Sequence, residues 1–269
     1  MQIDYVHAKI PKEYDPEMLV PGFETFKKAS DRRTRLIEVL RNSSSSTDDL
    51  VRRLVACHQE HRCESAACPV CLRRFRKWWC SRVTEFMDRN EEVVWYSINI
   101  VDHRQTYPLG ELEKFEPQKM KERLRKQLER STLSNALVCG GIDVNLTYYE
   151  GRAPKWCPHL YLLTSSGAES RIRFALERHY QATDDTLRPL RIEAVKQTIK
   201  DRARVSTYSF KATFDKRDPV RGGGYYRKHY PPVPDEHMPE LARALDTWGF
   251  GKRLIRRGHS NFLPEMRVR

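Results

Sequence analysis

The sequence predicts an α+β protein with one central antiparallel sheet of about five strands and helices packed on it. Between residues 93 and 213, strand-like and helix-like segments follow in the order strand, helix, two strands, helix, strand, helix. The two consecutive strands are joined by a short loop, which is typical of an antiparallel hairpin. A chain of 269 residues suffices for one large domain, or for a main domain with smaller modules.

The chain before the sheet is predicted to form an arm and two helices. Residues 1–22 contain three prolines and are expected to be irregular, whereas residues 23–40 have apolar residues at helical spacing. Residues 42–47 form a polar loop. A second helix is expected over residues 48–57, because two aspartates at its start suit the positive end of the helix dipole.

Four cysteines follow within fifteen residues, in the segment CHQEHRCESAACPVC. Structural zinc takes four soft ligands in a tetrahedron, and a Cys-Pro-Val-Cys turn points two sulfurs at one ion. The fourth ligand is Cys57, His58 or His61, of which we favour Cys57; free cysteines in a helical turn are the alternative. The predicted structural zinc ligands are Cys57, Cys63, Cys68 and Cys71.

A basic segment with aromatic residues, LRRFRKWWCSRVTEFMDR, comes directly after the cysteines and is predicted to be a helix. Cations interleaved with aromatic rings suit contacts with a nucleic-acid backbone. The alternative is that the tryptophans belong to the core and the arginines form a solvated face. The candidate nucleic-acid contacts are Arg73, Arg74, Arg76 and Lys77.

The remaining elements are assigned from periodicity and from turn residues. Strands are expected at residues 93–101, 141–149, 158–164 and 189–195. Helices are expected at residues 118–131, 169–181, 197–213 and 236–248.

Two polar residues of the predicted hairpin are candidate metal ligands. Alternation places Asp143 on the polar face of the first strand and His159 on one face of the second. If the strands pair, we expect the two side chains to meet on an exposed face, where a carboxylate and an imidazole can bind a divalent metal. The alternative is that His159 is an ordinary strand histidine.

The formal net charge is +13, and the basic residues are spread along the chain. This charge favours a polyanionic partner, most commonly nucleic acid, over a membrane surface. The sequence has no apolar stretch of the length of a spanning helix and no apolar signal core near residue 1, so we expect a cytoplasmic protein without a membrane partner. In that compartment seven cysteines indicate metal ligands or free thiols.

The last quarter of the chain offers a second candidate nucleic-acid surface. Residues 221–232 are rich in glycine and then in aromatic and basic residues, a composition that suits base stacking, although an ordinary surface loop has it too. Residues 252–257 are strongly basic and are expected either to contact a nucleic-acid backbone or simply to be solvated. The candidate contacts in the loop are Tyr225, Tyr226, Arg227 and Lys228.

The order of these motifs resembles that of a known family. A CPVC knuckle, a basic WW helix, a strand, a GGIDV strand leading to WCPHLYLL, and a YSFK element follow one another over residues 57–214. This order resembles the rolling-circle replication initiators of plasmids and related mobile elements, which belong to the HUH endonuclease superfamily. The resemblance implies an HUH-like or RRM-like nuclease domain at residues 91–215. Its flanks are an arm (1–50), a zinc-knuckle module (51–90) and a basic, partly helical extension (216–269).

The resemblance also implies chemistry. In that family a tyrosine attacks a DNA phosphate with the help of a divalent metal, leaving a 5′-phosphotyrosine and a free 3′-hydroxyl that primes synthesis. Tyr208 matches this tyrosine, and Lys211 is expected on the same helix face. His159 and Asp143 match metal ligands for Mg²⁺ or Mn²⁺. The family motif has a second histidine where this chain has Tyr161, which puts the metal site in doubt.

Two functions follow from these expectations. The first is an enzyme that nicks and rejoins single-stranded or hairpin DNA at an origin through a tyrosine-phosphodiester, with a host helicase as a further partner. The alternative is a weakened or inactive HUH-derived module that binds DNA and keeps its structural zinc. A zinc-containing RNA-binding protein shares the charge but does not explain the hairpin followed by Tyr208 and Lys211.

Overall fold

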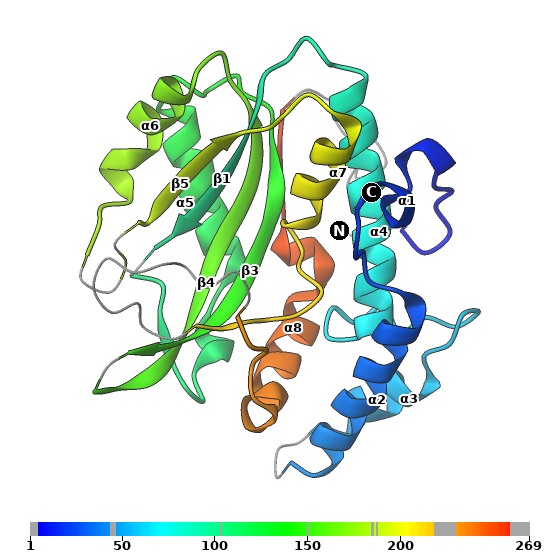
Figure 1. Ribbon diagram of the computed structural model, residues 1–269. Coiled ribbons are helices and arrows are strands. Elements are labelled where there is room, and N and C mark those ends of the chain that lie inside the picture. Colours follow the sequence, from blue (N-terminus) through cyan, green and yellow to red (C-terminus); the bar gives the residue numbers. More distant parts are fainter. Residues whose placement is uncertain are drawn as a thin grey trace.

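The computed structural model describes residues 5–43, 47–102, 104–149, 151–183, 186, 188–217 and 230–258. Within these residues it has eight α-helices and one sheet of seven strands, which confirms the predicted α+β class (Figure 1). The helices are α1 (Pro16–Leu19), α2 (Phe26–Arg41), α3 (Asp48–Ala56), α4 (Pro69–Asp88), α5 (Pro117–Glu129), α6 (Glu169–Leu176), α7 (Ile199–Thr207) and α8 (Met238–Arg253). The strands are β1 (Trp95–Val101), β2 (Tyr107–Pro108), β3 (Val138–Tyr149), β4 (Arg152–Ser165), β5 (Leu190–Ala194), β6 (Lys216–Arg217) and β7 (Leu254–Arg257).

The sheet has the order β5-β1-β4-β3-β6, with β2 paired to β4 and β7 paired to β3. All pairs are antiparallel except the two-residue pairing of β6 with β3. The long β3–β4 hairpin turns at Gly151, whose φ of 66° is readily adopted by glycine. The four strands expected from the sequence are β5, β1, β4 and β3 of this path, and β6 was not expected.

The register of the hairpin decides which residues share a face. Asp143 lies opposite His159 and Ile142 lies opposite Leu160. Because side chains alternate along a strand, Ile142 and Leu160 face one side of the sheet, and Asp143, His159 and Tyr161 face the other. All of these except Tyr161 are buried, so helices or loops cover both faces of the hairpin.

Helix α4 lies alongside α7 and is surrounded by other parts of the chain (Figure 1). Trp79 Nε1 donates to the carbonyl oxygen of Ser206 at 3.2 Å, and Arg76 donates to that of Phe210. Trp78 and Trp79 are at most 1% exposed, so the core alternative for the tryptophans is correct. One hydrophobic cluster joins residues from all four predicted regions, among them Leu54, Ile98 and Leu254.

Two elements differ from the expectations. Helix α7 ends at Thr207 rather than at residue 213, with Tyr208 as its C-cap, so Tyr208 and Lys211 do not lie on one helix. The basic run at residues 252–257 is only partly at the surface: Lys252 and Arg256 are exposed, whereas the Arg253 side chain at the end of α8 is buried and β7 pairs with β3. A helix boundary and an edge strand in a basic run both depend on tertiary partners that local sequence does not contain.

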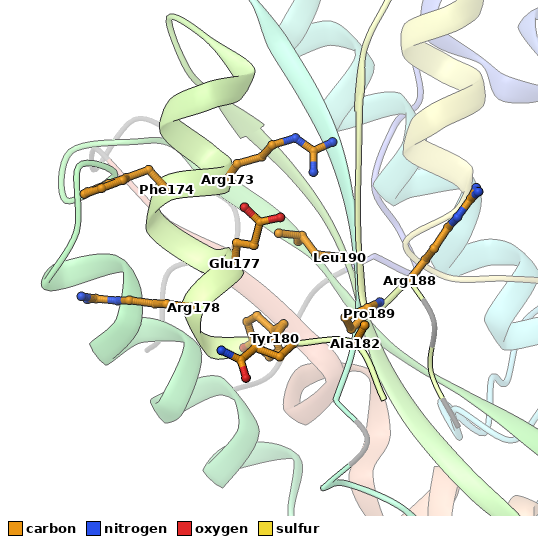
Figure 2. A pocket seen from close by; sticks show the side chains of 10 residues that line it. Arg173, Phe174, Glu177, Arg178, Tyr180, Ala182, Arg188, Pro189 and Leu190 are labelled. Atoms are coloured by element: carbon orange, nitrogen blue, oxygen red, sulfur yellow. The ribbon is translucent and has the colours of Figure 1, made fainter. Parts of the chain in front are cut away.

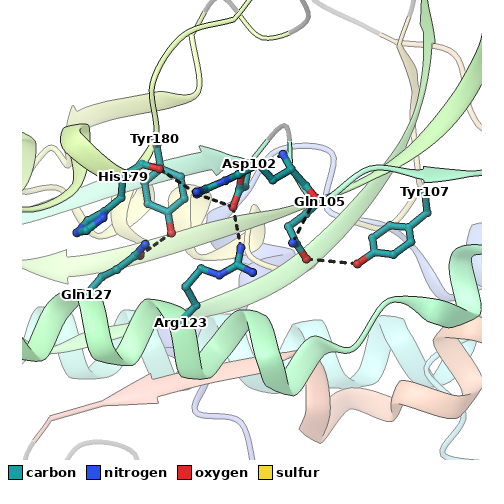
Figure 3. Close-up of polar contacts among 8 residues, drawn as sticks. Asp102, Gln105, Tyr107, Arg123, Gln127, His179 and Tyr180 are labelled. Atoms are coloured by element: carbon teal, nitrogen blue, oxygen red, sulfur yellow. Dashed lines mark hydrogen bonds and ion pairs between the residues drawn. The ribbon is translucent and has the colours of Figure 1, made fainter.

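A polar network fixes the end of β1 to α5 (Figure 3). Asp102 is 3% exposed and accepts hydrogen bonds from Arg104 Nε and Arg123 Nη1, each at 2.9 Å. Burial raises the pKa of Asp102, but the hydrogen bonds and charges of these two arginines outweigh it and hold the pKa below its ordinary value. Tyr180 donates to Gln127 Oε1 at 2.7 Å in the same network.

No helix in the described ranges combines the length and the apolar character that a bilayer crossing requires.

Candidate active site and metal centre

The four cysteines come together beside the start of α4. The Sγ–Sγ distances are 3.6 Å for Cys57–Cys71, 3.6 Å for Cys63–Cys71 and 3.8 Å for Cys57–Cys68. Zn–S bonds of about 2.3 Å in a tetrahedron place sulfurs about 3.8 Å apart. The cluster therefore fits a metal ion such as zinc.

Cys57 is the fourth member of the cluster, as favoured from the sequence. His58 and His61 are exposed, and they lie against each other with ring centroids 5.9 Å apart. The pKa of Cys57 is lowered because its sulfur accepts hydrogen bonds from the thiols of Cys63, Cys68 and Cys71. The pKa of Cys71 is raised chiefly because its thiol donates a hydrogen bond to Cys57. A bound cation lets all four sulfurs ionise together.

Asp143 and His159 meet as the hairpin predicts, but not on an exposed face. Both are fully buried, and Asp143 Oδ2 lies 3.6 Å from His159 Nε2. Both Asp143 oxygens and His159 Nε2 lack a hydrogen-bond partner among the described residues. The expectation of an exposed face is wrong because α8 and residues 208–215 cover this part of the sheet.

Two cations lie against the Asp143 carboxylate. Lys211 Nζ is 3.4 Å from Oδ2 and also pairs with Asp215 at 3.0 Å. Arg253 Nη2 is 3.8 Å from Oδ1, and its Nε donates to the carbonyl oxygen of Ile142 at 3.0 Å. Sequence analysis missed Arg253, because it sits in the run KRLIRR; the two apolar residues that begin β7 were the only sign that this run is not all surface.

The charges at this site follow from burial and from these neighbours. Burial lowers the pKa of His159 to about 3, against the opposing charge of Asp143, so the imidazole is neutral at pH 7. Burial raises the pKa of Asp143, but Lys211, His159 and Arg253 outweigh it and the pKa stays below its ordinary value. Burial lowers the pKa of Arg253 to about 10, which leaves the guanidinium charged.

Tyr208 lies at the edge of this cluster. Its side chain is 37% exposed, and its ring packs against Tyr161 with centroids 5.4 Å apart. Gly141 allows the segment after α7 to approach β3, since a Cβ there would collide with the carbonyl oxygen of Ser209 and the ring of Phe210. Tyr208 can therefore be reached from outside, whereas Asp143 and His159 cannot.

The expected Mg²⁺ or Mn²⁺ does not fit the donor set at Asp143 and His159. Among the described residues, the four thiols are the only group of three or more metal-type ligands gathered closely. Magnesium needs six oxygen ligands, several of them water, but both donors here are fully buried. Lys211 and Arg253 instead place a positive charge 3.4 and 3.8 Å from the two oxygens of the carboxylate.

The four cations of α4 bind other parts of the chain, and their expected contacts with nucleic acid stay a prediction. Arg73 binds the Glu24 carbonyl oxygen and the Glu17 carboxylate, and Lys77 pairs with Glu17 and Asp15. Their partners lie in the N-terminal segment, which the sequence marked as a loose arm.

The other two cations of α4 are held in the same way. Arg74 donates to the carbonyl oxygens of Val6 and Ala8, and Arg76 faces Glu24 at 3.7 Å as well as binding Phe210. Arg76 is 7% exposed. Arg76 is therefore removed from the surface, whereas Arg74 stays partly exposed.

The loop contacts predicted at Tyr225, Tyr226, Arg227 and Lys228 lie outside the described residues. An open pocket of about 630 Å³ lies between α6 and β5, with Arg173, Arg178 and Tyr180 in its wall (Figure 2). None of the predicted site residues lines this pocket.

Comparison with models of protein families, with curated proteins and with solved structures finds no match to this chain. The resemblance to rolling-circle initiators therefore depends on the order of the motifs, and membership of that family stays a prediction.

Proposed function

We propose that this protein nicks and rejoins single-stranded or hairpin DNA at an origin, as the rolling-circle initiators that it resembles do. The observation that carries the proposal is a convergence on one face of the sheet. Lys211 reaches Asp143 on β3, and Tyr208 reaches Tyr161 two residues beyond His159 on β4. These residues are separated by up to 68 positions in the sequence.

The proposed reaction is a transesterification at Tyr208. The phenol oxygen attacks a DNA phosphorus, the bond to the 3′-oxygen breaks, and the chain keeps a 5′-phosphotyrosine. The phenol loses its proton, and the leaving 3′-oxygen takes one up to become a hydroxyl, which can later attack the adduct and restore the DNA strand. The Lys211 side chain is 21% exposed, and its ammonium supplies positive charge for the phosphate oxygens.

The cysteine cluster has a structural part in this proposal, with zinc as its metal. Helix α4 begins at the Cys68–Cys71 turn, and its later turns bind the carbonyl oxygens of Ser206 and Phe210 on either side of Tyr208. The metal would fix the start of α4 and thereby the segment that carries the nucleophile.

The test is covalent capture of labelled DNA. Zinc-loaded protein is incubated with single-stranded and hairpin oligonucleotides from candidate origins, then denatured and separated by size. The proposal expects a labelled protein that disappears in Tyr208→Phe and persists in Tyr161→Phe, a matched control whose ring contacts the same site. If the adduct were lost in Tyr161→Phe but kept in Tyr208→Phe, Tyr161 and not Tyr208 would be the nucleophile.

A second function is favoured by two features of the Asp143 site. Asp143 and His159 are fully buried, and Tyr161 stands in place of the second histidine of the family motif. These features favour an HUH-derived module that binds DNA without cutting it. Salt-sensitive binding with no adduct on any oligonucleotide would support the module, and equal binding of RNA would turn the assignment toward an RNA-binding protein. A host helicase as a partner stays a prediction.

A further inference from the structure

The Asp143 carboxylate lies between two cations of its own chain. Lys211 Nζ faces Oδ2 at 3.4 Å, and Arg253 Nη2 faces Oδ1 at 3.8 Å. In a metal-dependent site, this carboxylate would have its oxygens free for the ion. Here each oxygen faces a positive charge that the fold itself provides.

Arg253 cannot leave this position for solvent. Its side chain is fully buried, its Nε is fixed to the Ile142 carbonyl oxygen, and its guanidinium lies over the rings of Phe210 and Phe214 at 5.4 and 5.6 Å. Its Nη1 and Nη2 find no hydrogen-bond partner among the described residues. A buried guanidinium needs a counter-charge, and Asp143 is the acid that faces it.

The wider cluster has an excess of positive charge. Two carboxylates, Asp143 and Asp215, stand against three cations, Lys211, Arg253 and Arg217, of which Arg217 donates to the side-chain oxygen of Asn145 at 2.8 Å. Such a cluster attracts an anion and disfavours a divalent cation. Lys211 is the member that combines partial exposure with a place three residues from Tyr208.

We infer that Arg253 is a positioning residue that replaces a catalytic metal ion: it holds Asp143, and Asp143 in turn holds Lys211 where a phosphodiester at Tyr208 would lie. Arg253 does not touch the DNA. This inference rests on the proposed function and makes the transesterification independent of divalent metal. The reaction exchanges one phosphate ester for another, with the phenol proton passing through solvent to the leaving 3′-oxygen, and needs no further reactant.

The first test measures Mn²⁺ binding and does not depend on activity. Full-length protein with zinc in the cysteine cluster is titrated with Mn²⁺, and free Mn²⁺ is followed by electron paramagnetic resonance. We expect the wild type to bind Mn²⁺ at Asp143 no more tightly than about 1 mM. Arg253→Met should tighten binding by roughly tenfold or more, because it removes a charge that repels the ion. The gain should vanish in Arg253→Met/Asp143→Asn.

The inference is overturned if the wild type binds Mn²⁺ in the micromolar range and Asp143→Asn abolishes that binding. It is also overturned if Arg253→Met folds and gains no affinity for Mn²⁺. Should Arg253→Met fail to fold, Lys211→Met removes the other cation from the same carboxylate at a partly exposed position, and the same gain or its absence decides.

The second test repeats the DNA capture with EDTA or with Mn²⁺, after zinc loading and rapid mixing. We expect adduct yields within about twofold of each other for the wild type, a large loss in Arg253→Met with EDTA, and recovery in Arg253→Lys. An adduct that forms only with Mn²⁺ overturns the inference and leaves the proposed function standing. No adduct in any condition overturns the proposed function, while the Mn²⁺ titration still decides the role of Arg253.

Discussion

The cysteine cluster and the Asp143 site are both gatherings of metal-type ligands, but only one fits a metal. At the cysteine cluster four like donors converge with spacings of 3.6 to 3.8 Å, and the neighbouring Arg33 donates to the carbonyl oxygen of Cys57 rather than to a sulfur. At the sheet, one carboxylate and one imidazole converge with Lys211 and Arg253 against the carboxylate. The difference teaches that ligand type alone does not define a metal site; the charges around the donors decide whether an ion is accepted.

The largest expected effect is at the cysteine cluster. Cys71→Ser should lose the bound zinc and lower the free energy of unfolding by roughly 5 kcal/mol or more, because this ligand lies in the first turn of α4. Zinc content and urea unfolding measure both effects. Cys139→Ser, at a buried cysteine outside the cluster, is the control and should keep the zinc. Full zinc content in Cys71→Ser would contradict the four-thiol site.

The next effect tests the opposite region. Asp143→Asn should lower the free energy of unfolding by about 3–5 kcal/mol, because it leaves the Arg253 charge buried without a counter-charge. The double variant Asp143→Asn/Arg253→Met should regain part of the loss, since the charge itself is then removed. Urea unfolding of the single and double variants measures this coupling, with exposed Glu193→Gln as the control. Simple additivity would mean that the two groups do not interact.

Acid should affect the Asp143 site through His159. The unfolded chain protonates this imidazole near pH 6.5, whereas the folded chain does so only near pH 3, so the unfolded state carries more protons between these values. Protonation of His159 therefore lowers the free energy of unfolding as the pH drops below about 6.5, by about 2 kcal/mol at pH 5. The pH dependence of unfolding in His159→Asn should be flatter than in the wild type. The exposed His61→Asn control should follow the wild-type curve.

The smallest effect concerns the cations of α4. Lys77→Gln should cost about 1 kcal/mol of stability, because Lys77 loses its ion pairs with Asp15 and Glu17 at 2.8 and 2.6 Å. DNA affinity and its salt dependence should not change, since this ammonium is not offered to a ligand. The exposed Arg191→Gln is the control. If Lys77→Gln bound DNA more weakly and with less salt dependence than this control, Lys77 would contact DNA after all.

Sequence spacing predicted most of the fold and one region of the site fully. The four cysteines lie within fifteen residues, so local spacing was enough to name them. The pairing of Asp143 with His159 also followed from strand alternation across one short loop. Whether the pair was exposed could not be predicted, because its covering residues come from beyond residue 207.

Arg253 shows why the rest of the site could not be predicted from the sequence. It belongs to a run of four cations among six residues, and composition alone cannot separate a buried guanidinium from its solvated neighbours. Arg253 is the last residue of α8, next to the pairing of β7 with β3, and its side chain reaches the carbonyl oxygen of Ile142 on β3. The contacts of the α4 cations within the chain could not be foreseen for a related reason, since their partners are mostly backbone carbonyl oxygens and acids of residues 5–24.

The hold of α4 on the N-terminal segment has a practical consequence for anyone who shortens the chain. A truncation that begins at α2 would strip the acids and carbonyl groups from Arg73, Arg74 and Lys77. Such a fragment would acquire a bare cationic ridge and an artificial, nonspecific affinity for any polyanion, heparin included. Tight binding by that fragment would report on the cut, not on the native protein.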